Sequence, residues 1–429
     1  MKNNRLYKGI LYAAIPFVLL FAVFVITGQN AFSGIALVLF FAALAFGVRG
    51  SEKLKGYSYS LWIFAAVTVS MYFPEYFLGV GSFQFKKLII PLLQIIMFGM
   101  GSQMALSDLT NVIKMPKGVI AGVICQYTIM PFLGITIAMS FGFPPEIAAG
   151  VILIGSSPSG LASNVMSYIA RANLALSVTI TAITTIISPF MTPMLMKLLA
   201  GELVEVNFWK MMLDIFNMVI LPIVAGLIFN MVAYRNVKGR AWVLQLLAYL
   251  AIIVLKNMIS MNAEEITGAA LIQKLATDVF WFAALPALAA VAFHFFAKGD
   301  KAYLDKGLAF VSMAGIAVII TIITAAGRDS LLEVGLLLIL ACFIHNTFGY
   351  GLGYVVARFL LRMPEKDCRT IAFEVGMQNG GLASGLALQM GKVATVGLAP
   401  AVFGPLMNIT GSTLATWWRT RTNEEKIEK

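Results

Sequence analysis

Residues 373–389 read FEVGMQNGGLASGLALQ, and they lie within a long apolar part of the chain. A membrane-spanning helix needs about 20 consecutive apolar residues, and a carboxylate inside one is costly. This stretch nevertheless gathers polar side chains and glycines: Glu374, Gln378 and Asn379 beside Gly376, Gly380 and Gly381. Because glycine weakens a helix, we expect an interrupted helix with polar groups at the interruption.

The composition is that of a protein with many membrane spans. Of the 429 residues, 60% are hydrophobic and 12% are charged, and long apolar runs recur along the chain. The formal net charge is +11, but Lys and Arg stand singly or in small groups between the apolar runs. This favours membrane topology over a nucleic-acid partner. The three cysteines have neither the spacing of a metal site nor that of a disulfide framework, and we expect no cofactor.

The beginning of the chain combines a basic start with an apolar run, as a cleaved signal peptide does. The run is long for a signal peptide, has no A-x-A cleavage pattern and is soon followed by another apolar run. We therefore expect a retained membrane helix.

Spans of about 20 residues, separated at Gly, Pro and charge clusters, predict fourteen helices: 8–27, 31–48, 58–78, 86–105, 118–140, 145–170, 174–199, 209–233, 241–260, 278–297, 305–326, 331–361, 368–390 and 394–419. With both termini in the cytoplasm of a bacterial inner-membrane protein, all but eight of the 31 Lys and Arg residues fall on the inner side. The eight are Lys86, Lys87, Lys197, Lys210, Lys256, Lys274, Arg328 and Lys392. This bias supports the count and the orientation together. Lys256 lies inside a predicted span, so it must reach the interface or find a partner.

A second interrupted span reads GVILIGSSPSGLASNVMSYIA, residues 150–170. Pro158 lacks a backbone donor, and the serines and Asn164 around it offer oxygens. SGLAS (159–163) matches GGLAS (380–384), and each lies in the next-to-last span of a seven-span half. An odd number of spans in each half makes the halves inverted repeats, here 1–205 and 206–429, and paired broken helices indicate a transporter site near the membrane midplane.

Close helix packing is the alternative explanation for the glycines, because small residues also line ordinary membrane-helix interfaces. For Glu374 the alternative is a structural partner of a buried base, but no Lys or Arg lies near enough in the sequence to be assigned as that base. The cost of an intramembrane carboxylate favours a functional role.

Two segments resemble the signatures of the bile acid:sodium symporter family. They are GSSPSGLASNVMSYIARANLALSVTITAITTIISPFMTP (155–193) and TIAFEVGMQNGGLASGLAL (370–388); CQYTIMP (125–131) is similar to a third element, and the resemblance covers most of 58–235 and 303–419. It implies an all-α inverted-repeat transporter with two crossing broken helices. A core domain (about 116–200 and 331–420) would move against a panel domain (about 8–110 and 209–326). Two extra helix pairs, near 8–48 and 241–297, would enlarge the panel.

The resemblance also implies two sodium sites. The first would use Ser163, Asn164, Ser177, Thr181 and Glu374. The second would use Gln126, Gln378, the Glu374 carboxylate and the backbone oxygens of Val375 and Met377. Sodium is a hard cation that prefers several oxygen ligands, which fits these residue types. For Ser177 and Thr181 alone, bonding of the hydroxyls to helix carbonyls is the alternative.

The resemblance implies a substrate cavity bordered by Ser159, Gly160, Leu161, Asn379, Gly380, Met407, Asn408 and His345. Leu161 replaces a common threonine, Ser159 replaces a frequent glycine, and Met407 stands where some relatives of the family have histidine. These departures leave the substrate open among bile acids, pantoate-like, pyruvate-like and sulfated anions. For His345, a hydrogen-bonded structural role is the alternative.

The sequence thus predicts a sodium-coupled symporter of a small organic anion, with the anion, sodium ions and the bilayer as partners and no particular oligomeric state. Proton-coupled or sodium-independent anion carriers of the same fold are alternatives. An arsenite-type exporter would need a thiol in the first broken helix, where this chain has Ser156 and Ser157. An intramembrane enzyme is disfavoured, because HExxH is absent and all seven aspartates fall at predicted span ends or in loops.

Overall fold

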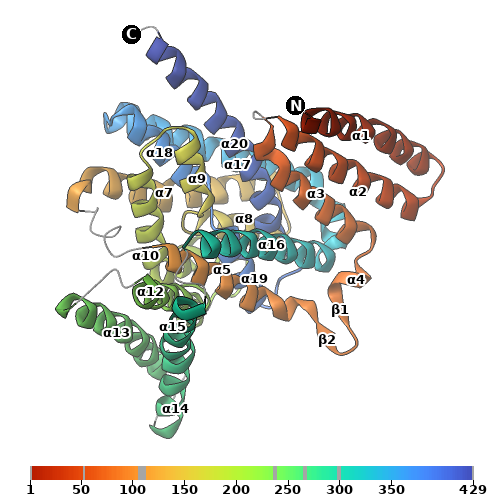
Figure 1. The fold of residues 1–429 in the computed structure, drawn as a ribbon. Coiled ribbons are helices and arrows are strands. Elements are labelled where there is room, and N and C mark those ends of the chain that lie inside the picture. The colour runs from red at the N-terminus through yellow and green to blue at the C-terminus, as the bar shows by residue number, and fades with distance from the viewer. Residues whose placement is uncertain are drawn as a thin grey trace.

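The computed structural model describes residues 2–51, 54–104, 113–234, 239–263, 268–296 and 301–427, and these are mostly helical (Figure 1). The only strands among them are β1 (Gly79–Val80) and β2 (Phe83–Gln84), which form a small antiparallel hairpin. The predicted span ends at 105 and 297 lie outside the described residues.

Ten stretches in the described part of the chain are long and apolar enough to cross a membrane: Leu6–Ile26, Asn30–Gly50, Phe85–Gln103, Pro116–Phe141, Leu174–Ala200, Phe208–Tyr234, Arg240–Met261, Gly268–Phe295, Lys306–Ala326 and Arg328–Leu360. The protein is therefore an all-α, multi-pass membrane protein. Ten of the fourteen predicted spans correspond to these stretches.

The other four predicted spans differ from a single long apolar helix. One is α3 (Ser58–Tyr72), followed by the short α4 (Glu75–Leu78), and another is α20 (Leu398–Ile427), which extends to a charged end. The remaining two are interrupted, as α8 (Pro145–Gly155) with α9 (Ala162–Ile169), and as α18 (Glu365–Gly376) with α19 (Gly380–Gln389). The count of fourteen stays a prediction for these four.

Helices from both halves of the chain surround the interrupted ones (Figure 1). They are α7 (Pro116–Phe141), α10 (Leu174–Ala200), α17 (Arg328–Val355) and α20. Every residue of α8 from Ile147 to Gly155 and of α18 from Cys368 to Gly376 is buried. A helix that is apolar on all sides can be enclosed by its neighbours, which explains how α8 occupies the interior.

Further helices flank this central group. They are α5 (Ile89–Gln103), α11 (Phe208–Ile215), α12 (Leu221–Tyr234) and α16 (Lys301–Ala326). Single π-helical turns occur at Phe216–Ile220 between α11 and α12, and at Val356–Leu360 after α17; short 3₁₀ turns occur at Val48–Gly50, Lys55–Tyr57 and Phe85–Leu88.

The two extra helix pairs lie at the periphery (Figure 1). α1 (Lys2–Ile26) packs along α2 (Asn30–Gly47), and most of its described side chains are exposed. α13 (Arg240–Ala263) packs on α14 (Gly268–Val279), which continues through a π-helical turn (Phe280–Ala284) into α15 (Leu285–Phe296). In a bilayer the exposed apolar side chains of these helices face lipid.

A buried ion pair joins α13 to α14. Lys256 is 1% exposed, and its Nζ lies 2.8 Å from Oδ2 of Asp278, which also accepts from Asn257 Nδ2 at 2.8 Å. Our expectation that Asp278 lies at a span end is wrong, because the apolar helix begins at Gly268 and Asp278 lies inside it. The carboxylate is tolerated there because the ammonium of Lys256 compensates it.

We predict that Lys256→Met alone lowers the stability of the protein by about 3–5 kcal/mol, because it leaves the buried Asp278 charge without its partner. The double variant Lys256→Met with Asp278→Leu should recover most of this loss, since neither charge remains. Melting temperatures of the purified protein in detergent measure both effects. The control is Lys87→Met, at an exposed lysine. A single variant as stable as the unchanged protein would contradict the prediction.

Candidate functional site

The two interrupted helices meet at their breaks and satisfy each other's backbone groups. The N–H of Gly160 donates to the carbonyl of Met377, and the N–H of Asn379 donates to the carbonyl of Pro158, both at 2.8 Å. Ser159 and Gln378 form an antiparallel bridge between these bonds. Exposed backbone groups cannot face lipid, so each break depends on the other.

The local sequence explains why the first helix breaks here. Pro158 has no N–H to continue a helix. Gly160 lies so close to the carbonyl of Gln378 that a Cβ there would press on the carbonyl oxygen. The freed carbonyls of Ser156 and Ser157 accept from Thr192 Oγ1 and Gln126 Nε2, each at 2.8 Å.

The ends of the broken helices that lie away from the crossing are also joined in pairs. At the start of α8, the carboxylate of Glu146 pairs with Lys392 and accepts from Thr395 Oγ1 at 2.5 Å, both in the segment after α19. At the start of α18, Asp367 Oδ1 accepts from Asn173 Nδ2 at 2.8 Å, just before α10. The four helices α8, α9, α18 and α19 are therefore joined to one another at the crossing and at the ends away from it.

Glu374 lies at the crossing and is fully buried. Its Oε1 accepts from the hydroxyls of Ser163 (2.6 Å) and Ser177 (2.5 Å), and its Oε2 accepts from Thr181 Oγ1 (2.8 Å). Thr181 Oγ1 also lies 3.3 Å from Asn164 Oδ1. The five residues expected at the first sodium site therefore lie together, on α9, α10 and α18.

The carboxylate of Glu374 forms no ion pair within the described part of the chain. Hydroxyl groups alone solvate it, and burial of a carboxylate without a cationic partner is costly. The ends of α8 and α18 bring negative dipole ends to the crossing, while the starts of α9 and α19 bring positive ones. Such a site can hold a cation against carbonyls and a carboxylate, and an anionic group against amides.

The residues expected at the second sodium site also lie together. Gln126 Nε2 donates to Gln378 Oε1 at 2.7 Å, and Gln378 Nε2 donates to the carbonyl of Val375 at 2.5 Å. Both glutamines are fully buried. The amides bind each other here, so a cation at this place would have to replace the bond between them.

The residues expected to border the substrate cavity divide into two groups. Ser159, Gly160, Asn379 and Gly380 lie at the crossing itself, where Ser159 Oγ donates to the Glu374 carbonyl at 2.8 Å and Asn379 Oδ1 caps α19. Leu161, beside them, is 37% exposed. The second group, Met407 and Asn408, lies on α20, where Met407 is buried and Asn408 Nδ2 donates to the Gly404 carbonyl at 2.9 Å.

His345 fits the structural alternative. It is fully buried, its Nε2 lies 2.9 Å from the carbonyl of Met130, and its ring packs edge-on against Phe403. These contacts join α17 to α7 and α20 by local packing.

Several polar residues outside the two predicted sodium sites also support the crossing. Thr192 is one, and Asn346 and Thr410 are others: Asn346 Nδ2 donates to the Gly376 carbonyl at 2.8 Å and Thr410 Oγ1 donates to Asn346 Oδ1 at 2.5 Å. The sequence signal for Asn346 is that it is a polar residue inside an apolar span with no nearby partner in the sequence.

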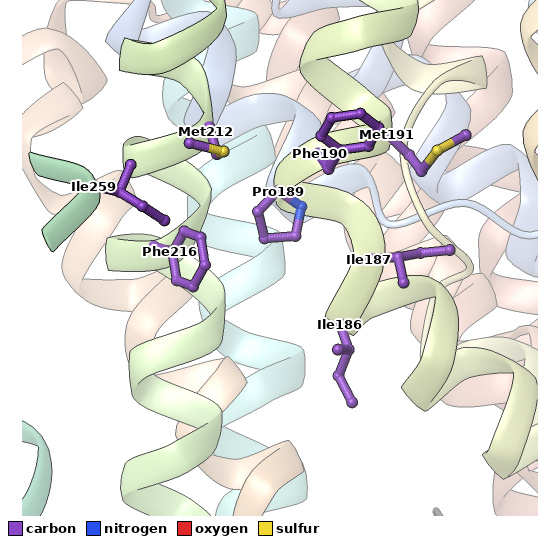
Figure 2. Close-up of a pocket in the computed structure, with 8 residues that line it drawn as sticks. All are labelled: Ile186, Ile187, Pro189, Phe190, Met191, Met212, Phe216 and Ile259. Carbon is purple, nitrogen blue, oxygen red and sulfur yellow. The ribbon is translucent and has the colours of Figure 1, made fainter. Parts of the chain in front are cut away.

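The structure also contains an apolar pocket of about 380 Å³ (Figure 2). It is lined by α10, α11, the π-helical turn after α11, and α13: Ile186, Ile187, Pro189, Phe190, Met191, Met212, Phe216 and Ile259. A more polar pocket of about 280 Å³ lies between α11 and the end of α19 and includes Lys210, Asp214 and Gln389. Glu374 lines neither of these two pockets and is fully buried.

Comparisons with known proteins agree with the resemblance. Residues 90–267 match the model of the Sodium Bile acid symporter family. The "Uncharacterized sodium-dependent transporter YocS" of Bacillus subtilis (strain 168) is 32% identical over 380 residues, which cover 88% of this chain and 96% of that protein. The "Probable sodium/metabolite cotransporter BASS1, chloroplastic" of Oryza sativa subsp. japonica is 28% identical over 374 residues, 86% of this chain and 74% of that protein. With its buried carboxylate at the meeting of two broken helices, the chain belongs to the sodium bile acid symporter family.

Proposed function

We propose that this protein is a secondary transporter that couples the entry of sodium to the uptake of a small organic anion by alternating access. The observation that carries the proposal is the fully buried Glu374, whose carboxylate is surrounded by hydroxyls and lies at the meeting of two broken helices. The names of the two relatives, a sodium-dependent transporter and a sodium/metabolite cotransporter, also support sodium-coupled transport.

The first sodium ion would bind Ser163, Asn164, Ser177, Thr181 and Glu374. Three hydroxyl groups donate to the carboxylate in the structure. Hydroxyls can rotate and present lone pairs instead, so sodium would replace these hydrogen bonds by direct contacts to the same oxygens. The second ion would bind Gln126, Gln378, Glu374 and the carbonyls of Val375 and Met377, displacing the bond between the two amides.

Repeated hydrogen bonds support the inverted-repeat arrangement of residues 1–205 and 206–429. After α9, Arg171 adopts a positive φ of 54° and the N–H of Ala172 donates to the Ser167 carbonyl. After α19, Gly391 adopts a φ of 72° and the N–H of Lys392 donates to the Ala387 carbonyl. Each residue of the second group lies the same number of residues after its counterpart in the first group.

Alternating access would use the core domain (about 116–200 and 331–420) as the moving unit and the panel domain (about 8–110 and 209–326) as its support, with both termini in the cytoplasm. The bonds that join the broken helices at the crossing and at both ends all lie within the proposed core. They favour movement of the broken helices together.

The driving force is large enough for accumulation. Two sodium ions entering with one monovalent anion carry one net charge, worth about 2.3 kcal/mol at 100 mV. A tenfold sodium gradient adds about 2.7 kcal/mol for two ions. The sum of roughly 5 kcal/mol supports accumulation of several thousandfold.

The substrate class can be tested on purified protein. We expect at least one small organic anion to raise the melting temperature in sodium chloride but not in choline chloride, because sodium would complete the anion site. A panel of bile acids, pantoate, pyruvate and sulfated steroids covers the classes left open by sequence. Uptake of the hit into proteoliposomes should require an inward sodium gradient. Uptake driven by a pH gradient without sodium would instead support proton coupling and contradict the proposal.

Glu374→Gln should abolish sodium-dependent uptake and the stabilisation by sodium. The substitution preserves the size of the side chain but removes the negative charge that both proposed ions share. The control is Glu333→Gln on α17, because Glu333 is exposed. Uptake at normal rates by Glu374→Gln, or full sodium stabilisation of it, would show that the carboxylate is not a ligand.

Thr181→Val should raise the sodium concentration for half-maximal stabilisation roughly tenfold or more, since it removes a ligand oxygen at constant shape. Thr181→Ser should restore the normal value. Thr185→Val is a matched control one turn along α10, since the Thr185 hydroxyl donates to the backbone carbonyl of Thr181 at 2.7 Å. Equal sodium titrations of Thr181→Val and Thr185→Val would remove Thr181 from the first site.

A further inference from the structure

The end of α18 carries four successive carbonyls that each accept a hydrogen bond from a different residue. The carbonyls of Glu374, Val375, Gly376 and Met377 accept from Ser159 Oγ (2.8 Å), Gln378 Nε2 (2.5 Å), Asn346 Nδ2 (2.8 Å) and the Gly160 N–H (2.8 Å), respectively. The last carbonyls of a helix have no partner within the helix. Here the neighbouring elements satisfy each of them.

The Gly376 carbonyl differs from its two neighbours. The carbonyls of Val375 and Met377 belong to the ligand set proposed for the second sodium ion, whereas that of Gly376 does not. Its partner Asn346 comes from α17 and is fully buried. The Gly376 carbonyl is thus held in place by a side chain of another helix.

The orientation of the Asn346 amide is fixed by its two partners. A carbonyl can only accept, so Gly376 requires the amide nitrogen, and Oδ1 is left to accept from a hydroxyl. Thr410 Oγ1 of α20 supplies that hydroxyl at 2.5 Å. The Gly376 carbonyl therefore determines which way the amide of Asn346 faces, and Thr410 holds the oxygen end of that amide.

The backbone at Gly376 needs such a support. Glycine has the widest backbone freedom, and only glycine fits here, because a Cβ would overlap the ring of Tyr350. Met377, which follows, is extended with φ −108° and ψ 109°. Holding the Gly376 carbonyl fixes the peptide plane before Met377, and the Gly160 N–H holds the Met377 carbonyl that follows.

We propose that Asn346 and Thr410 are positioning residues of the second sodium site. Asn346 holds the Gly376 carbonyl and so fixes the peptide plane that leads to Met377, while Thr410 holds the oxygen end of the Asn346 amide. The proposal rests on the proposed function, because it concerns the same site. The bond between Asn346 and Thr410 also connects the site to α20. A second bond between the same two helices lies beside the expected substrate cavity, where Tyr350 OH of α17 donates to the Met407 carbonyl of α20 at 3.1 Å.

The test is a sodium titration of the full-length purified protein in detergent, read as melting temperature, with choline chloride keeping the ionic strength constant. Thr410→Val should raise the half-maximal sodium concentration about fivefold, the equivalent of one hydrogen bond. Thr410→Ser should titrate like the unchanged protein because it keeps the hydroxyl. Asn346→Asp should raise the concentration roughly tenfold or more, because a carboxylate cannot donate to the Gly376 carbonyl.

The matched control is Thr416→Val on α20, because the Thr416 hydroxyl donates to the Ser412 carbonyl of its own helix at 2.8 Å. A purely structural role would lower the melting temperature without sodium and leave the half-maximal concentration unchanged, and this result in Thr410→Val would overturn the inference. If Asn346→Asp does not fold, the Thr410 series decides alone. If the unchanged protein gains no stability specific to sodium, the proposed function itself fails, and the two failures are thereby distinguished.

Discussion

The hydrogen bonds exchanged by the two broken helices are the constraint on which the rest of this structure depends. A membrane helix that opens its backbone exposes donors and acceptors that lipid cannot satisfy. Gly160, Pro158, Met377 and Asn379 satisfy them across the crossing. The surrounding helices of the central group then keep lipid away from the crossing, and their apolar surfaces explain the high hydrophobic content of the chain.

Glu374 benefits from the same arrangement. At the crossing three hydroxyls lie at hydrogen-bond distance from the carboxylate, and two of these, from Ser177 and Thr181, require α10 to pass directly beside α18. The end contacts at Glu146 and Asn173 maintain this approach. The polar centre is thus assembled from parts of the chain that are far apart in sequence.

Much of this arrangement could be predicted from the sequence, since its signals are local. The two breaks are indicated by Pro158, the glycines and Glu374. The resemblance to a family then adds Ser177, Thr181 and Gln126 to the predicted sodium sites. Contacts between distant polar residues in otherwise apolar helices could not be predicted. Lys256 of α13 pairs with Asp278 of α14, and the sequence placed Asp278 at a span end because the preceding residues of α14 are polar enough to resemble a loop. Asn346 and Thr410 likewise carry no local sign of their bond, which arises only from the packing of α17 against α20.

The crossing has a consequence for the order of events during biosynthesis. The acceptor of Ser159 Oγ, the Glu374 carbonyl, lies 215 residues further along the chain. The acceptor of the Gly160 N–H, the Met377 carbonyl, lies similarly far along. When α8 and α9 leave the ribosome, the helix that will complete their break has not been made. The first half of the protein must therefore persist in the membrane, or at the insertion machinery, with an open polar break until α18 and α19 arrive. A chain truncated before α18 would keep that break unsatisfied, which makes it a natural target for the quality control of membrane proteins.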